Sequence, residues 1–376
     1  MKKNYISALA VLACVAVFCT ISGNSFHQMR TATEEIIPGE GVTEVRMLSD
    51  YFPDLAGTAG DTQIYVLQGE QEGGSCLILG GTHANELGGH MGAVLFVENA
   101  KVEAGTLYVI PRTNNSAFTH NDPQEGHPST VHITTDEGNV REFIHGSRAT
   151  NPVDQWPDPD VYVNYMGQSL SGSENRNINR TYPGKADGTL TEMMSYGIVQ
   201  LINTENIDVT VDLHEASPEY PVINALIAHE RAMNLASNVV VDMEMEGVQI
   251  SLEPSPTDLR GLTHRELGDH TDTLALLMEA PNPAQGRLRD RTDEALVLTG
   301  KSETYVKAGE IGQLYVPYDE NGWPIEVRCA RHVFGIERIL ANYSEMYEEP
   351  IIVTGMPSYD ELVKNGMGPY LNEPTT

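Results

Sequence analysis

The sequence predicts an α/β fold with three layers, in which helices cover both faces of a mixed, mostly parallel central sheet. Two observations support this prediction. Short apolar runs typical of buried strands alternate along the chain with longer segments of helical periodicity. In addition, His83, His214 and Glu279 each follow one of these runs, at the edge where open α/β sheets bind their ligands.

Three runs predict the first half of the sheet. Thr62–Leu67 alternates as a half-buried strand does, and Gly73-Gly74 is expected to turn the chain into the apolar run Cys76–Leu79. Glycines after this run let the backbone turn sharply into a helix over residues 86–96. Residues 106–110 form the third predicted strand, which a proline ends.

Residues 114–165 are rich in Asn, Asp, His, Pro and Gly and lack sustained periodicity. A structureless loop of this length is uncommon in a compact domain and is usually functional where it occurs. We therefore expect a long loop region that walls a site.

The alternation of strands and helices resumes after this region. A helix over residues 191–203 leads to a strand over 209–213, which ends at His214. A further apolar stretch over 222–227 precedes a helix over 230–245.

The remaining part of the chain supplies one more strand and a long helix. Residues 251–271 lack periodicity and are expected to form a loop. A strand over 273–278 ends at Glu279, just before a proline-rich turn. A last strong helix is predicted over 327–343, and no internal repeat or linker divides the chain.

The N-terminus carries two lysines, a largely apolar run from Ile6 to Ile21, and then polar residues, which is the pattern of a secretory signal. Cleavage near Ser22 or Gly23 fits the preference for small residues, and an uncleaved anchor is the alternative. Residues 1–23 are thus expected to be a signal peptide or N-terminal anchor. Residues 24–376 form a single exported domain, extracellular or at the cell surface, that starts with an extended lead-in.

The net charge is −30, from 53 acidic and 23 basic residues. This charge disfavours nucleic acid or an anionic membrane surface as a partner, because either would be repelled over most of the protein surface. Membrane association is expected only if the N-terminal segment is uncleaved. The exported part keeps only Cys76 and Cys329, so it is no disulfide scaffold, and whether the two pair is left open.

Candidate metal ligands lie at the ends of two predicted strands. His83 and Glu86 are three residues apart, so their side chains share one face of a first helical turn. His214 completes a set of two imidazoles and one carboxylate, which leaves one coordination position of a zinc ion open. We expect one Zn²⁺ per chain.

Glu279 is the natural general base, which takes a proton from the attacking water and passes it to the leaving amine. Glu215 competes for this role by its position, although its side chain points away from that of His214 if the strand continues. Asp212 lies two residues before His214, shares its face, and is expected to orient it.

The ordered motifs resemble those of a known superfamily. They are His83-Ala84-Asn85-Glu86, Asn179-Arg180-Thr181-Tyr182-Pro183-Gly184, Asp212-Leu213-His214 and Glu279. Together, over residues 75–285, they resemble the zinc carboxypeptidase superfamily, and Asn85 is closer to its succinylglutamate desuccinylase/aspartoacylase branch than to the peptidases. Two features depart from the family pattern: Ala84 replaces the usual glycine, and the region 114–165 is enlarged.

The resemblance implies roles for individual residues. It implies zinc ligands at His83, Glu86 and His214, a catalytic carboxylate at Glu279, and a substrate carboxylate held by Asn179 and Arg180. The peptidases have a second basic residue that polarises the carbonyl. Its candidates here are Arg112, Arg141, Arg148 and Arg176, of which we favour Arg148.

The expected function is that of an exported zinc-dependent amidohydrolase that cleaves an amide next to a carboxylate, as an N-acyl amino acid deacylase does. One alternative is a secreted metallocarboxypeptidase that acts on peptide C-termini. A non-catalytic secreted binding protein is a third possibility, which the intact ligand set and Glu279 disfavour. The G-x-S-x-G motif of serine hydrolases is absent.

Overall fold

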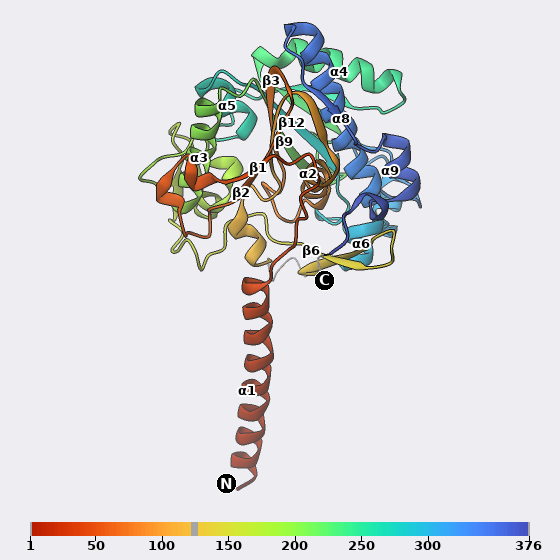
Figure 1. The fold of residues 1–376 in the computed structure, drawn as a ribbon. Coiled ribbons are helices and arrows are strands. Elements are labelled where there is room, and N and C mark those ends of the chain that lie inside the picture. The colour runs from red at the N-terminus through yellow and green to blue at the C-terminus, as the bar shows by residue number, and fades with distance from the viewer. Residues whose placement is uncertain (1, 122–126, 375–376) are drawn as a thin grey trace.

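The structure is a computed structural model that describes residues 2–121 and 127–374 (Figure 1). The strands are Glu44–Met47 (β1), Gln63–Gln68 (β2), Gln71–Leu79 (β3), Lys101–Ile110 (β4), Thr130–Thr134 (β5), Val140–Ile144 (β6), Val161–Val163 (β7), Ser169–Ser171 (β8), Val209–Ala216 (β9), Ala225–Ala228 (β10), Ser251–Pro254 (β11), Leu274–Pro281 (β12) and Ile352–Thr354 (β13). The α-helices are Lys2–Thr31 (α1), Leu87–Asn99 (α2), Leu190–Glu205 (α3), Met233–Met245 (α4), Thr263–His270 (α5), Glu294–Thr299 (α6), Glu303–Glu310 (α7), Ile325–Tyr347 (α8) and Tyr359–Asn365 (α9). The 3₁₀ helices are Leu48–Asp50 (η1), Pro53–Leu55 (η2), Asn115–Thr119 (η3), Gly172–Arg176 (η4), Ile178–Arg180 (η5), Glu230–Ala232 (η6) and Gly368–Tyr370 (η7).

One mixed sheet forms the centre of the molecule. Its strand order is β1-β2-β4-β3-β9-β12-β10-β11, and β13 pairs with β4 at one side. The four central strands β4, β3, β9 and β12 are parallel, whereas β1, β2, β10 and β13 bring antiparallel pairings. Residues of β9 are buried on both faces, as expected for a central parallel strand. The predicted α/β class is confirmed.

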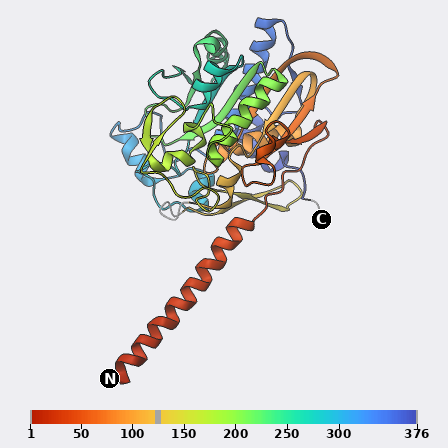
Figure 2. The same cartoon turned by 90° about the vertical axis from the view of Figure 1, so that its left-hand side faces the viewer.

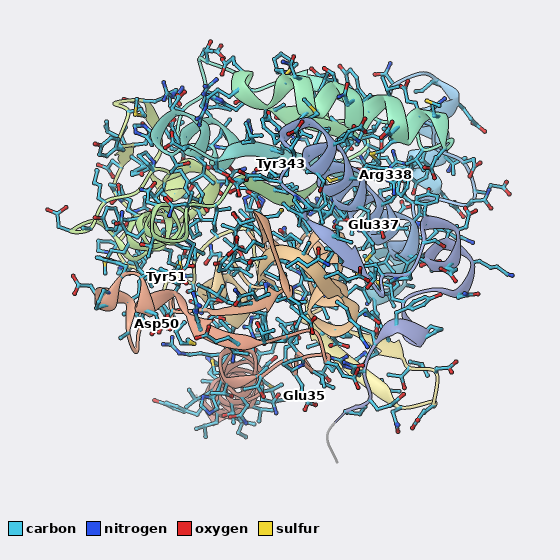
Figure 3. All side chains as sticks on the ribbon, turned by 45° about the horizontal axis from the view of Figure 1, so that its top comes forward. Glu35, Asp50, Tyr51, Glu337, Arg338 and Tyr343 are labelled. Carbon is cyan, nitrogen blue, oxygen red and sulfur yellow. The ribbon has the colours of Figure 1, made fainter. Side chains whose placement is uncertain are left out.

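Helices cover both faces of this sheet. One apolar cluster joins the sheet to α2, α4 and α8, and a second joins the opposite face to α3, α5, η1 and η2. Figure 3 shows Arg338 and Tyr343 on α8 in the first layer, and Tyr51 on the other side of the molecule. There the Tyr51 hydroxyl donates a hydrogen bond to Glu205 at the end of α3.

Two segments that were expected to be loops contain regular structure. Residues 114–165 include η3, the β5–β6 hairpin, and β7, which pairs with β8 in a second small sheet. Residues 251–271 contain β11 and α5. Gly73-Gly74, expected to form a turn, instead lie inside β3 at a register shift. These elements are short or polar, so they lack the apolar periodicity that identifies longer elements.

The N-terminal helix α1 projects away from the rest of the molecule (Figures 1 and 2). Within the described residues, the segment Asn4–Thr31 is the one helix long and apolar enough to cross a membrane, with a mean hydropathy of 2.3 and no buried residue. A secretory signal sequence has the same property.

Candidate metal centre

The turn after β3 places the first two candidate ligands. Gly81 has a φ of +61°, and a Cβ atom there would lie 2.5 Å from the carbonyl oxygen of Pro111, so the tight turn requires glycine. His83 lies in this turn, and Glu86 immediately precedes α2. The two residues therefore lie in the strand–helix connection and not, as expected, on the first helical turn.

The other two site residues come from neighbouring strands. His214 of β9 and Glu279 of β12 are directly paired positions of two parallel strands, so their side chains lie on the same face of the sheet. Both strands continue two residues past these positions, although the sequence predicted that the strands end before them. The buried polar side chains thus belong to the strands themselves.

The three candidate ligands converge. His83 Nδ1 lies 2.7 Å from Glu86 Oε1, and His214 Nδ1 lies 2.9 Å from Glu86 Oε2. One ligand atom from each residue lies within 4.8 Å of the others, and each residue is about 1% exposed. Among the described residues, this is the group of histidine and acidic side chains that could hold a metal ion.

Neighbouring groups fix the orientation of both imidazoles. His83 Nε2 lies 2.9 Å from Asn177 Oδ1, and His214 Nε2 lies 2.8 Å from Asp212 Oδ2. Thr82 Oγ1 donates to the other oxygen of Asp212 at 2.6 Å. In this arrangement each Nδ1 is directed at the centre of the triad, which is how metal-binding histidines are usually held.

The electrostatics of the triad suit a cation. Burial, together with Arg148, lowers the pKa of His83 to about 4, so this imidazole is in its neutral, ligand form at neutral pH. Burial also disfavours charge on His214, but Asp212 and Glu86 outweigh it and raise the pKa. The same carboxylates that favour a proton there favour a metal ion. Two imidazoles and one carboxylate therefore fit zinc with an open position.

Glu279 lies next to the triad with a free acceptor. Its Oε2 atom is buried and has no hydrogen-bond partner in the described part of the chain. Burial raises the pKa of Glu279 to about 8. A dication held by the three ligands would lower this pKa again, because it favours the ionised carboxylate.

The carboxylate of Glu215 is bound by protein groups outside the triad. Its carboxylate accepts hydrogen bonds from the Gly88 backbone, from Arg328 and from Asn282. Its backbone N–H donates to Glu86 Oε2 at 3.0 Å. Glu215 therefore helps to position a ligand, and its carboxylate is fully engaged elsewhere.

Two arginines and an amide face the triad. Arg148 Nη1 lies 3.3 Å from Glu86 Oε1. Arg180 Nη1 donates to the Asn179 carbonyl at 2.5 Å, and its Nε lies 3.6 Å from Glu174. The Asn179 side-chain oxygen accepts from Thr263, so its NH₂ group is the part that a ligand can use.

All seven predicted site residues line one cavity of about 440 Å³. These residues are His83, Glu86, Arg148, Asn179, Arg180, His214 and Glu279. Its other walls include Tyr220, Val222, Ile227, Glu253, Pro254, Leu259, Leu262, His264 and Leu277. The other three candidate arginines lie elsewhere, where Arg112 stacks on Phe118, Arg141 pairs with Glu98, and Arg176 pairs with Asp158.

Several supporting residues were not predicted from the sequence. Asn177 lies two residues before the Asn179-Arg180 motif, and its contact with His83 depends on a fold that joins residues 94 positions apart. Thr82 directly precedes His83. Of these supporting residues, it is the one whose role could have been inferred from the sequence, because it is adjacent to a candidate ligand. The sequence left open whether Cys76 and Cys329 form a disulfide. In the structure both are buried and neither is paired with the other.

No protein-family model matches the chain, and no curated protein matches it significantly. Among solved structures, the molecule is similar to a succinylglutamate desuccinylase from Silicibacter sp. TM1040, with 17% identity and a TM-score of 0.39 over 60% of this chain and 55% of the other. The metallo-carboxypeptidase from Burkholderia cenocepacia aligns at 11% identity and a TM-score of 0.46, over 85% of this chain and 68% of the other. The product-bound cell shape determinant protein Csd4 from Helicobacter pylori aligns at 13% identity and a TM-score of 0.46, over 80% and 59%.

The chain spans little more than half the length of the two structures named as succinylglutamate desuccinylases, with 55% and 54% of those chains covered. The identities are low throughout. Each of these matches is a similarity of structure.

Proposed function

We propose that the protein is an exported zinc-dependent amidohydrolase that cleaves an amide bond next to a carboxylate, as an N-acyl amino acid deacylase does. The observation that carries this proposal is the convergence on one cavity of a buried His83–Glu86–His214 group, a carboxylate with a free oxygen, and two arginines. Each group supplies one of the requirements of amide hydrolysis.

His83, Glu86 and His214 would hold the zinc ion. Zinc bound in such a site polarises a carbonyl group and lowers the pKa of water. Glu279 then acts as the general base: it accepts a proton from the attacking water and delivers it to the nitrogen of the leaving amine. The net reaction adds one water across the C–N bond and yields a carboxylic acid and an amine.

The arginines give the site its preference for a carboxylate. With a net charge of −30, the protein repels anionic substrates, so recognition requires a strong local cation. The planar guanidinium of Arg180 can hold a carboxylate through two parallel hydrogen bonds, and the Asn179 NH₂ group can add a third. Arg148 Nη1 lies 3.3 Å from the candidate ligand Glu86, so we assign to Arg148 the polarisation of the scissile carbonyl.

One observation favours the second candidate function, a metallocarboxypeptidase that acts on peptide C-termini. Leu277, Ile227 and Glu253 are paired positions of β12, β10 and β11, so they share one sheet face and line the cavity beside Glu279. An apolar wall of this kind accommodates the side chain of a C-terminal residue. The carboxylate of Glu253 at its far end favours a cationic group there.

A hydrolysis screen of the zinc-loaded protein tests both functions. The substrates are N-acyl amino acids and short peptides with apolar or basic C-terminal residues, each with a free and an amidated carboxylate, and released amine is measured. We expect hydrolysis of free-carboxylate substrates only, with Glu279→Gln as the inactive, zinc-retaining control. Equal hydrolysis of the amidated substrates, or no hydrolysis of any carboxylate-bearing amide, would contradict the proposal.

A further inference from the structure

From Ile6 to Ile21, the surface of α1 is largely apolar around its whole circumference. Leu9, Leu12, Phe18 and Ile21 are each between 63% and 72% exposed, and no residue of the apolar window is buried. Its apolar window of 18 residues spans about 27 Å at the usual helical rise, close to the hydrocarbon thickness of a bilayer, about 30 Å. An exposed apolar surface of this size in water is strongly unfavourable, whereas lipid covers it favourably.

The junction between α1 and the domain contains no free linker. Arg30, in the last turn of α1, forms an ion pair with Asp154 at 3.1 Å. Ala32 packs on the apolar cluster of Ala84 and Phe118, next to the turn that carries His83. The helix leaves the domain beside these contacts and projects away from it, as Figure 2 shows.

A buried contact secures the chain immediately after this junction. The Glu34 side chain is fully buried and lies 2.6 Å from His90 Nε2 of α2, while its other oxygen accepts from the Ile144 backbone. An extended, mobile tether would need no such contact. The chain that follows α1 is instead attached to α2 and β6 of the domain.

The loop beside this base carries exposed apolar residues. Asp154, the partner of Arg30, is flanked by Val153, 69% exposed, and followed by Trp156, 74% exposed. Tryptophan is enriched at the membrane–water interface, where its ring sits at the level of the lipid headgroups. An arginine at the end of a spanning helix lies at the same level.

We propose that α1 is retained as a membrane-spanning anchor and that the loop 152–156 rests in the headgroup region of the bilayer beside it. The two lysines at the start of the chain place the N-terminus on the cytoplasmic side and the domain outside. Glu142 lines the cavity at the base of α1 together with Gln28 and Met29. This carboxylate and the net charge of −30 favour a zwitterionic lipid surface.

The chain offers a direct spectroscopic test, because Trp156 and Trp323 are its two tryptophans. The full-length protein is placed in nanodiscs of phosphatidylcholine whose acyl chains carry bromine atoms near the headgroup, which quench nearby tryptophans. Trp323→Phe leaves Trp156 as the only reporter. Trp156→Phe measures the quenching of Trp323 as the matched control.

We expect the fluorescence of Trp323→Phe to fall in brominated nanodiscs relative to unbrominated ones, and its emission to shift to the blue on reconstitution. The Trp156→Phe control should lose less of its signal. Equal fluorescence of Trp323→Phe in both lipids would refute the docking of the loop. Recovery of the expressed protein in soluble form, with a mature N-terminus after Ile21, would refute the anchor. Neither outcome bears on hydrolysis, which the screen tests separately.

Discussion

The cavity has two sides that differ in how they are built. The ligand side consists of His83, Glu86 and His214, which are about 1% exposed and come from the central sheet and the turn that follows it. The arginine side consists of Arg148 and Arg180, whose side chains are 41% and 20% exposed. The ligand side is therefore fixed before anything binds, whereas the arginines can adjust to a substrate. If this contrast is correct, substitutions on the ligand side change the zinc content, whereas substitutions on the arginine side change kcat/KM and leave the zinc content unchanged.

The largest effect is expected on the ligand side itself. His83→Ala and His214→Ala each remove one of three ligands, so the purified variants should lose their zinc and with it all activity. Elemental analysis of the purified proteins measures this directly. His132→Ala, at a half-exposed histidine outside the cavity, is the control and should keep zinc. Full zinc occupancy in both ligand variants would mean that the metal site is elsewhere.

The second prediction separates zinc binding from chemistry within the same cavity. Glu279 is not a ligand in this arrangement, so Glu279→Gln should retain zinc while it loses the proton-transfer group. Loss of a positioned acid–base group typically lowers the rate by a factor of about 10²–10⁴. Rate and zinc content are measured on the same preparation. Near-normal turnover would assign the base to another residue and remove Glu279 from the mechanism.

The third prediction concerns the arginine side. Arg180→Lys keeps the charge but loses the planar fork, and Arg180→Ala loses both. Charge-assisted hydrogen bonds contribute about 1.5–3 kcal/mol each, so kcat/KM should fall about tenfold to several hundredfold without any change in zinc content.

The substrate itself provides the control for Arg180. Amidation of the substrate carboxylate should impair the wild-type protein severely and Arg180→Ala much less, because the variant has already lost the interaction. Equal losses in both proteins would show that Arg180 does not recognise the carboxylate. The test would then move to Arg148.

The two sides also differ in how far the sequence predicts them. The strand before His83 is an apolar run that ends at glycines, so its position and the metal site were predicted from local signals. The strands of His214 and Glu279 were predicted to end too early, because a buried functional polar residue resembles a strand end. The contacts of Arg148 and Arg180 depend on how the segment 114–180 folds over the site.

The missed elements have a common physical cause. Helix α5 contains mostly polar residues. Two of them, Arg265 and Glu266, can be buried because their charges are paired. Arg265 donates to Glu230 and Asp269, and Glu266 accepts from Arg260. Such a helix has no apolar stripe of the kind that sequence patterns detect. The β5–β6 and β7–β8 hairpins are only three to five residues per strand, too short for a clear alternation.

The smallest effect is expected at Asn177, which connects the ligand side of the cavity to the arginine side. Asn177 belongs to the chain segment that carries Arg180, yet its side-chain oxygen contacts the imidazole of His83 at 2.9 Å. Its NH₂ group donates to Glu174, which lies 3.6 Å from the Arg180 guanidinium. Loss of a group that orients a ligand typically lowers metal affinity about 10- to 100-fold.

Asn177→Ala should accordingly lower zinc affinity by this factor, measured by competition with a chelator, while KM at saturating zinc stays within the range of wild type. Asn175→Ala is the matched control, because it removes a buried asparagine of the same segment that is not among the residues lining the cavity. If Asn177→Ala raises KM at saturating zinc as much as it weakens zinc, the segment couples metal and substrate. The ligand side and the arginine side would then be one cooperative unit, because the side chain that orients His83 would also set the position of Arg180.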